Sequence, residues 1–453
     1  MSIRGRLTRI PNAAINSGGY IYRSLEEANL SINAHGYLSR GEPNIYIAAD
    51  GTLYRCLLKP ENAWIKVSGM EGVNWLTCLY TGNGFIAVGN EQTATDASGE
   101  SVSHAVTAVS DDGITWQQYR QEWKNVIGKN GTYPTSHAAY GNGTFAVISA
   151  GAITGDRGIY CSKDGGKTLT EVSGTGDNYV DLGSWSSGFN SYQHYITKFF
   201  TDIAFGNGVF VATMFTNEVE RLITSAGVTT LKNERNAYFM VSSNGTSWTK
   251  VAASNAPYYY IGNERHSPYY RSITFMDGYF YAAASGEVVD EVRCFKCAKS
   301  LDGMFWQENV MENHSHLVMG LFSLNGTLCS VGWRCWETSD GAFTHTQEIA
   351  WSADGNASWK FEDCGGTFPN PEYIKVSSDG KRAITASTGD SNGYTYLLYR
   401  FWPYSKGSDL GQPFSGMRVK NVNVLAHGGN KFIALGVPGN TKGAAYYIFR
   451  RTT

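Results

Sequence analysis

Short hydrophobic segments recur along the chain, and each is interrupted by a turn of Gly, Asn or Asp residues. The segments are LYTGNGFIAVG from Leu79, AAYGNGTFAVI from Ala138, IAFGNGVFVAT from Ile203, ITFMDGYFYAAA from Ile273, FSLNGTLCSVG from Phe322, VSSDGKRAITA from Val376 and LAHGGNKFIALG from Leu425. Asn-Gly or Asp-Gly between alternating apolar residues is the strongest local signal for a β-hairpin, because both turn residues need positive φ. Each segment is therefore expected to form two antiparallel strands.

A second kind of hairpin alternates with the first and carries a Ser, an Asp and usually a Trp. It reads VSDDGITW at Val109, CSKDGGKTL at Cys161, VSSNGTSW at Val241, KSLDGMFW at Lys299 and WSADGNASW at Trp351. These segments resemble the Asp boxes of sialidase-like β-propellers, with Leu169 replacing the Trp in the second segment. The resemblance implies that Ser and Asp bind the backbone of the turn and that Trp packs beneath it, which is a structural role.

Two hairpins make a four-stranded antiparallel sheet, and a ring of such sheets buries the faces that each would leave bare alone. The fold class expected is therefore all-β, a β-propeller with blades starting near residues 78, 137, 202, 272, 317, 373 and 422, about seven in all. The last blade supplies only three strands, and the strand at residues 63–69 is expected to complete it. The sixth blade lacks an Asp box, so six or eight blades remain alternatives.

Composition agrees with this architecture and excludes some classes of function. Aromatic residues make up 13% of the chain and charged residues 17%, with 52 Gly and 11 Pro, as suits many short strands joined by tight turns. The formal net charge of −2 gives no basic field, so nucleic-acid binding is not expected. No apolar run is long enough to span a bilayer and no secretory signal is present, so synthesis in a cytoplasm is expected. The eight Cys residues are expected to be reduced core thiols.

Most residues beyond a minimal blade fall between the second and third strands or between blades, at the end of the ring opposite the tight turns. The expected long loops are 90–103, 120–135, 173–199, 214–236, 252–270 and 332–346. Aromatic residues concentrate in three of them, and we take these as candidate binding residues: Trp185, Tyr192, Tyr258, Tyr259, Tyr260, Tyr269, Tyr270, Trp333 and Trp336. Aromatic rings among polar neighbours are typical of surfaces that bind sugars or flat protein epitopes. The alternative is that the loops pack on one another and bury these rings.

No catalytic residue, metal ligand or cofactor site is assigned from the sequence. Arg9-Ile10-Pro11 resembles the tripeptide that precedes Asp boxes in sialidases, but it lies far upstream of the first blade and is taken as a chance match. Glu287, Asp290 and Glu291 could supply paired carboxylates, although the run is also typical of a solvated loop. His314 and His316 would share one face of a strand without an identifiable third ligand.

Residues 1–60 do not follow the blade pattern and form a separate N-terminal segment. A short helix is expected from Ser24, where Ser24 and Glu27 form a capping box, and a hairpin is expected around Asp50 and Gly51. The order YRSLEEAN, GEPNIYIAADGTLYRC and a Trp-bearing strand resembles N-terminal modules of bacteriophage tail fibres, and the blade repeats are similar to domains of phage tail proteins. The resemblance implies a virion protein that attaches to other tail proteins through residues 1–60.

Three functions compete at this stage. The leading hypothesis is a tail-fibre or receptor-binding component that binds a host surface glycan or outer-membrane protein through the loop-rich end, without catalysis. The alternatives are a sialidase-like enzyme that cleaves glycans and a structural tail adaptor. The ligand and the oligomeric state are left open, a homo-oligomer included, because fold constrains function weakly.

Overall fold

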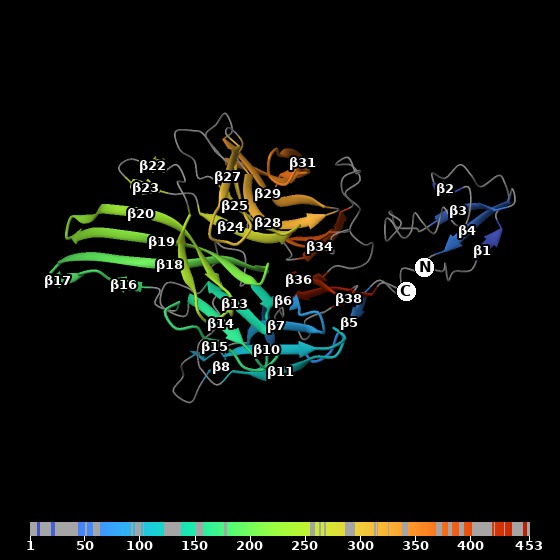
Figure 1. The fold of residues 1–453 in the computed structure, drawn as a ribbon, viewed down its shortest axis with the longest axis horizontal. Helices are drawn as coiled ribbons and strands as arrows, with labels where there is room; N and C mark the ends of the chain where they lie inside the picture. The colour runs from blue at the N-terminus through green and yellow to red at the C-terminus, as the bar shows by residue number, and fades with distance from the viewer. Residues whose placement is uncertain are drawn as a thin grey trace.

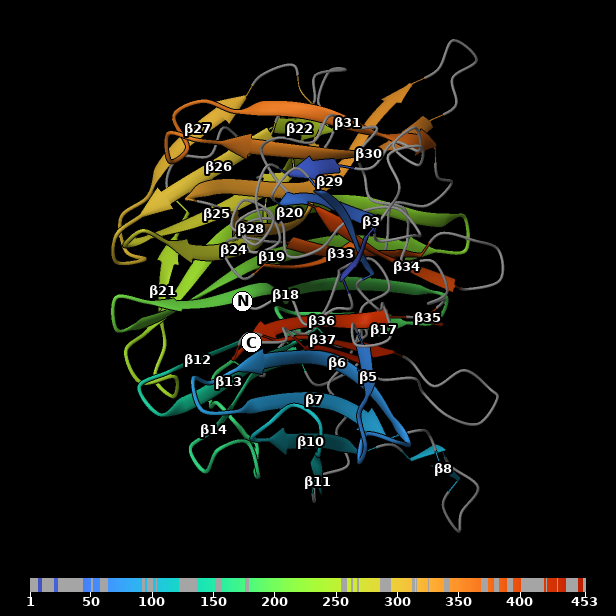
Figure 2. The ribbon, with the colours of Figure 1, turned by 90° about the vertical axis from the view of Figure 1, so that its right-hand side faces the viewer.

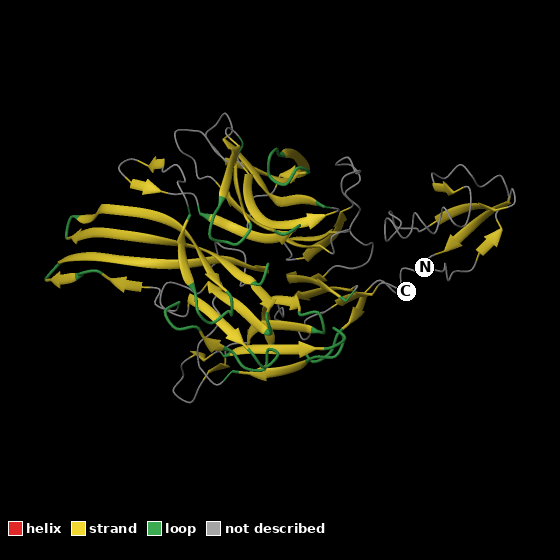
Figure 3. Ribbon diagram, viewed as in Figure 1, coloured by secondary structure: helices red, strands yellow, loops and turns green. Residues whose placement is uncertain are grey.

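A computed structural model of the protein describes its β-sheets and the turns between many of their strands. It describes residues 7–9, 20–22, 44–49, 52–57, 64–91, 94–95, 101–102, 104–121, 137–150, 157–175, 179–253, 259–261, 264–266, 269–285, 295–311, 314, 316–324, 326–337, 343–367, 374–378, 383–388, 394–400, 419–420, 422–429, 431–436 and 447–450. Strands and turns account for these residues, and none of them lies in a helix (Figure 3). Accordingly, no described helix is long and apolar enough to cross a membrane.

Seven sheets, each with four consecutive antiparallel neighbours, form the blades (Figure 1). Blades one to three contain β6 (Val73–Tyr80), β7 (Phe85–Glu91), β10 (Ala105–Ser110) and β11 (Gln117–Arg120); β12 (Ala138–Gly141), β13 (Thr144–Ala150), β14 (Arg157–Ser162) and β15 (Thr170–Glu171); and β18 (Asn190–Gly206), β19 (Val209–Thr224), β20 (Gly227–Ser242) and β21 (Thr249–Ala252). Blades four and five contain β24 (Tyr270–Met276), β25 (Tyr279–Ser285), β26 (Phe295–Ser300) and β27 (Gln307–Met311); and β28 (His316–Leu324), β29 (Thr327–Glu337), β30 (Phe343–Ser352) and β31 (Lys360–Thr367). Blades six and seven contain β32 (Ile374–Ser378), β33 (Ala383–Thr388), β34 (Tyr394–Arg400) and β35 (Val419–Lys420); and β36 (Val422–Gly428), β37 (Lys431–Gly436), β38 (Tyr447–Arg450) and β5 (Trp64–Lys66).

The first strand of each blade contacts the first strand of the next, and β36 of the last blade contacts β6 of the first (Figure 2). The outer strand of blade seven comes from the other end of the chain, because Ile65 of β5 lies opposite Ile448 of β38. This strand lies where the sequence analysis places it. In blade six, β35 supplies the outer strand that the sequence pattern left uncertain. The all-β propeller expected from the repeats is confirmed; in the described part of the chain six blades are four-stranded sheets, and the four strands of blade three belong to an eight-stranded sheet.

The hydrophobic core lies between adjacent blades. Buried clusters combine side chains of neighbouring sheets, for example Trp75 and Phe85 of blade one with Val424 and Ile433 of blade seven. Each sheet is thus covered on both faces only when the ring is complete, which is the physical reason for closure. Four cysteines, Cys78, Cys161, Cys297 and Cys329, lie buried in these layers as free thiols, as expected.

The Asp boxes have the structural role that their resemblance implies. In blade four, Asp302 Oδ1 accepts hydrogen bonds from the backbone N–H groups of Met304 at 2.8 Å and Phe305 at 3.2 Å. Ser300 Oγ accepts a hydrogen bond from Gly303 N, and the indole N–H of Trp306 donates to Gly303 O. The contacts of the Ser and the Asp recur in the other boxes, with Asn244 replacing the Asp in blade three, whereas blade two has Leu169 in place of the Trp.

Side chains of the tight turns connect neighbouring blades. The amide Nδ2 of Asn207 donates to Gly278 O at 2.7 Å and to Leu301 O at 2.9 Å, which belong to the two turns of blade four. Asn142 makes the equivalent pair of hydrogen bonds to blade three. Asn207 has φ of 47°, a left-handed conformation that Asn tolerates better than most residues. The Asn of the repeated turn therefore closes its own hairpin and also holds the next blade.

Blade three is much longer than the others and forms an arm (Figure 1). We define the arm as β16 (Tyr179–Asp181), β17 (Trp185–Ser187) and residues 190–199, 216–224 and 227–236 of β18, β19 and β20. Ten residues of strand correspond to about 30 Å. The arm lies at the end of the ring where surplus residues were expected, but the expectation of irregular loops at 173–199 and 214–236 is wrong. These segments pair in register from Ser191 opposite Ile223 onward, and their backbone groups are satisfied as a sheet.

The N-terminal segment forms its own sheet of four strands (Figure 1). The expected hairpin is present as β3 (Asn44–Ala49) and β4 (Thr52–Leu57), and it is flanked by β1 (Leu7–Arg9) and β2 (Tyr20–Tyr22), which the sequence analysis did not predict. The expected helix from Ser24 lies outside the described residues.

Candidate functional site

The aromatic residues predicted to bind a ligand fall into three groups. Trp185 and Tyr192 lie together on the arm. Tyr269, Tyr270 and Trp333 are buried, with 5%, 2% and 3% of their surface exposed, and therefore follow the self-packing alternative. Tyr258 lies outside the described residues. Tyr259 and Tyr260 lie in β22 (Tyr259–Ile261), and Trp336 lies in β29. The side chains of these three residues are not among those described.

Tyr269 is part of the base of the arm. Its ring lies 4.6 Å from that of Phe215, which stacks on Phe199 at 4.6 Å and 7°. The guanidinium of Arg235 lies over both Phe215 and Tyr269, 5.4 and 5.1 Å from the ring centroids. Tyr270, one residue further, donates its hydroxyl to Glu308 on the outer strand of blade four. These aromatic residues fix where the arm leaves the ring.

The far end of the arm exposes large apolar side chains. Trp185 in β17 lies opposite Tyr192 in β18, and their rings are 6.3 Å apart and nearly parallel, with an angle of 18°. Trp185 is 51% exposed, and Phe189, in the turn between these strands, is 88% exposed. Val180, Leu182, Val228 and Leu231 are also exposed on the arm. Exposed apolar groups gathered in one place commonly mark an interaction surface.

A row of charged side chains continues from the aromatic pair along the same face of the arm. The Tyr192 hydroxyl donates to Glu220, His194 Nε2 lies 2.9 Å from Glu218, and Lys232 Nζ lies 2.9 Å from Glu218. Lys232 also lies 3.5 Å from Glu234. Cross-strand neighbours share a face, so this row follows from the register of His194 opposite Glu220 and of Glu220 opposite Lys232.

Hydrogen bonding shifts the pKa values of three groups in this row, Tyr192, Glu218 and Lys232. The hydrogen bond to Glu220 raises the pKa of Tyr192, so its hydroxyl remains protonated. The hydrogen bonds from His194 and Lys232 lower the pKa of Glu218, and the same contact raises the pKa of Lys232. The face therefore presents carboxylates and an ammonium group beside the exposed indole.

The opposite face of the arm has a different character. Arg221 Nε donates to Gln193 Oε1 at 2.7 Å, and its guanidinium lies 5.5 Å from the centroid of the Tyr195 ring. A cation thus covers the aromatic ring on this face, whereas the indole of Trp185 on the other face is open. Sequence reasoning missed Glu218, Glu220 and Lys232, although alternating residues on either side of the Ser225-Ala226 turn are the signal for a hairpin.

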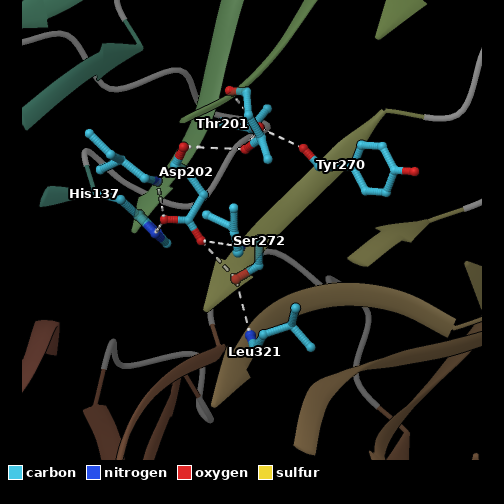
Figure 4. A network of polar contacts seen from close by, with 9 residues as sticks. His137, Thr201, Asp202, Tyr270, Ser272 and Leu321 are labelled. Atoms are coloured by element: carbon cyan, nitrogen blue, oxygen red, sulfur yellow. Dashed lines mark hydrogen bonds and ion pairs between the residues drawn. The ribbon is translucent and has the colours of Figure 1, made fainter. Parts of the chain in front are cut away.

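A second group of polar residues ties the first strands of four blades together (Figure 4). The carboxylate of Asp202 is buried and accepts hydrogen bonds from Ile203 N at 2.7 Å, Ser272 Oγ at 2.8 Å and Ile273 N at 2.8 Å. It also contacts His137 Nδ1 of blade two, and Ser272 Oγ accepts a hydrogen bond from Leu321 N of blade five. The oxygens of Asp202 are thus occupied by neighbouring blades, which indicates a structural role.

The two histidines predicted to share a strand face meet a buried glutamate. Glu348 receives His314 Nε2 at 2.9 Å and His316 Nδ1 at 2.7 Å, and His316 Nε2 lies 2.9 Å from Ser330 Oγ. Burial alone would raise the pKa of Glu348, but the hydrogen bonds from both histidines outweigh it and lower that pKa. Burial lowers the pKa of His316. Within the described part of the chain, no group of three His, Cys, Asp or Glu residues is placed to hold a metal ion.

The structure also places the residues considered for catalysis. Arg9 lies in β1 opposite Tyr54, in the N-terminal sheet and not on the first strand of a blade. Glu287, Asp290 and Glu291 lie outside the described residues. The interpretation of Arg9-Ile10-Pro11 as a sialidase motif therefore has no geometric support.

Comparison with known proteins finds similar solved structures but no matching sequence. No protein-family model and no curated protein sequence matches the chain. Among solved structures it is similar to the phage phi92 endosialidase, with 12% identity over 90% of this chain and 72% of that one and a TM-score of 0.40. It is similar to a Trypanosoma rangeli sialidase with 11% identity over 91% of this chain, a TM-score of 0.36 and 59% of that chain, less than two thirds of its length. The β-propeller domain of the Trilobed protease from Pyrococcus furiosus, described as having an open velcro topology, matches with 6% identity over 85% of this chain and 97% of that one and a TM-score of 0.41. At these identities and TM-scores the likeness carries no inference about function, and the β-propeller fold of the chain rests on its own seven blades.

Proposed function

We propose that the protein is a bacteriophage tail protein, a tail-fibre or receptor-binding component, that attaches to the host cell surface through the arm. The observation that carries this proposal is the pair of exposed aromatic residues at the end of a sheet that projects from the ring, Trp185 and Phe189. Large aromatic side chains on a rigid support are the usual anchors of a binding surface. The role requires adhesion and no turnover.

The remaining parts of the chain fit this role. The seven blades form a closed, rigid support. The contacts of Phe199, Phe215 and Tyr269 hold the arm to this support at its base. In this proposal, residues 1–60 attach the protein to other tail proteins, and the protein is part of the virion. The phage resemblance of the N-terminal segment supports this part of the proposal.

The test is adsorption to host cells. Purified protein is expected to bind the cells and to block adsorption of the phage, and the Trp185→Ala variant is expected to bind at least about tenfold more weakly, as for a central aromatic anchor. Phe305→Ala is the matched control, because Phe305 is 82% exposed but lies in the Asp-box turn of blade four. Release of reducing sugar is assayed in the same tubes. Turnover would favour a glycan-cleaving enzyme, and absence of cell binding would favour a structural tail adaptor.

A further inference from the structure

We infer that the Trp185 face of the arm binds an uncharged polysaccharide and discriminates against anionic ones. This inference rests on the proposed function and names the class of ligand for that site. Three properties of the face support it: the open aromatic surface, the spacing of hydrogen-bonding groups beside it, and the sign of their charges.

The aromatic surface has the shape that a sugar ring requires. Trp185 and Tyr192 are stacked and nearly parallel, at 18°, and Trp185 is half exposed, so the indole is accessible to solvent beside the tyrosine. The face of an aromatic ring carries partial negative charge and attracts the partially positive C–H groups on the face of a pyranose. Phe189 extends the apolar surface at the end of the arm. A stacked sugar would therefore lie along β17 and β18.

Hydrogen-bonding groups continue from this surface toward the base of the arm. Glu220 receives the Tyr192 hydroxyl, and Glu218 receives His194 and Lys232, so each carboxylate is held in position by a neighbour. A carboxylate has about four acceptor positions, and these contacts leave acceptor capacity on the arm surface. Sugar hydroxyls are donors that match such acceptors. Because the carboxylates lie on successive rows of one sheet face, they can bind successive units of an extended glycan chain.

The charges of the face select against anions. Its carboxylates are Glu218, Glu220 and Glu234, and its ammonium groups are Lys198 and Lys232, so negative charge is in excess. The first charged group beyond the Trp185 and Tyr192 pair is Glu220. An anionic glycan stacked on Trp185 would therefore bring its carboxylates toward Glu220. Lys232 lies beside Glu218 on this face, and a further cation of the arm, Arg221, lies on the opposite face over Tyr195.

The experiment uses the full-length protein and the polysaccharide of the host. Surface polysaccharide is extracted and separated by anion exchange into an uncharged fraction and an acidic fraction, and each is used to compete with binding of the protein to intact cells. The uncharged fraction is expected to block binding, and binding is expected to persist at high salt because it depends little on charge attraction. Trp185→Ala should lose binding while Phe305→Ala retains it.

A variant without the three carboxylates tests the selectivity directly. Replacing Glu218, Glu220 and Glu234 together by Gln is expected to raise the affinity for the acidic fraction by about threefold or more at low salt, because the repulsion is removed while Lys198 and Lys232 remain on the face. The inference would be overturned if the acidic fraction blocked binding of the unmodified protein to cells but no longer blocked binding of the Arg221→Ala variant. It would also be overturned by binding that is abolished by protease treatment of the cells and unaffected by periodate, which would identify a protein receptor. Both results leave the proposed function standing, whereas absence of cell binding would contradict the proposed function itself.

Discussion

Substituting Asp202 by Asn would test whether the polar contacts between first strands hold the ring together. The carboxylate accepts hydrogen bonds at both oxygens. Ile203 N donates to Oδ1, and Ser272 Oγ and Ile273 N donate to Oδ2. An Asn side chain presents one oxygen and one amide N–H₂ group. Whichever way the amide is oriented, at least one backbone N–H group, of Ile203 or of Ile273, meets a donor and loses its acceptor.

The expected cost follows from burial. A buried donor left without a partner costs about 1–3 kcal/mol, and a charged acceptor makes stronger hydrogen bonds than a neutral one. We expect the Asp202→Asn variant to lose roughly 3 kcal/mol of the free energy of unfolding. For a cooperative unit of this size that corresponds to a fall in Tm of about 3–4 °C.

Thermal unfolding followed by circular dichroism measures the effect, with Asp277→Asn as the control. Asp277 lies exposed in the tight turn of blade four with φ of 49°, a conformation that Asn tolerates well, so the control should unfold within about 1 °C of the unmodified protein. If both variants unfold at the same temperature, the contacts of Asp202 do not stabilise the ring and the reasoning is refuted.

Three further predictions concern the Asp boxes, the thiols and the closure. Partial burial would raise the pKa of Asp164, but hydrogen bonds from Thr168 and Ser162 lower that pKa to about 2. The ionised Asp164 should therefore stabilise the folded protein above pH 4, and this stabilisation should be lost as the pH falls toward 2. The Asp164→Asn variant should lack that part of the acid transition when Tm is measured against pH. Burial raises the pKa of the Cys329 thiol to about 12, and alkylation by iodoacetamide at pH 8, followed by peptide mapping, should modify Cys329 only after unfolding. Deletion of residues 1–69 removes β5 and buried Val67, so the last blade loses its outer strand. This deletion should lower Tm by several degrees relative to deletion of residues 1–60, and equal Tm values would contradict closure by this strand.

The repeats could be predicted because every tight turn is specified locally. Asn142 and Asn207 occupy positive-φ positions between alternating apolar residues, and these requirements are visible in the sequence without knowledge of the neighbours. The Asp boxes are equally local, since the Ser, the Asp and the Trp bind within one turn. Their recurrence then implied the ring, because isolated four-stranded sheets would leave both faces bare.

The strands of the arm could not be predicted from the residues of these segments. Both of its faces are half exposed, so polar residues such as Glu218 and apolar ones such as Val219 alternate without a fully buried side, and the usual pattern of one hydrophobic face is weak. The aromatic content of a segment also did not show whether its rings would be exposed or buried. Tyr192 and Tyr269 come from equally aromatic segments, but one lies on the arm and the other braces its base.

Asp202 gave no local signal at all. Its partners come from segments about 65 and 70 residues away along the chain, in His137 and Ser272, and only the closed ring brings them together. A β-bulge between Phe200 and Asp202 aligns the carboxylate with these groups, and such irregularities are not readable from a hydrophobic pattern.

The central claim, that the arm is the attachment surface, is tested most directly by measuring binding of the full-length protein to host cells with and without the indole of Trp185. We predict that the unmodified protein and the Phe305→Ala control bind equally and that Trp185→Ala binds at least about tenfold more weakly, with all three proteins unfolding at the same temperature. Equal binding by all three proteins would contradict the claim.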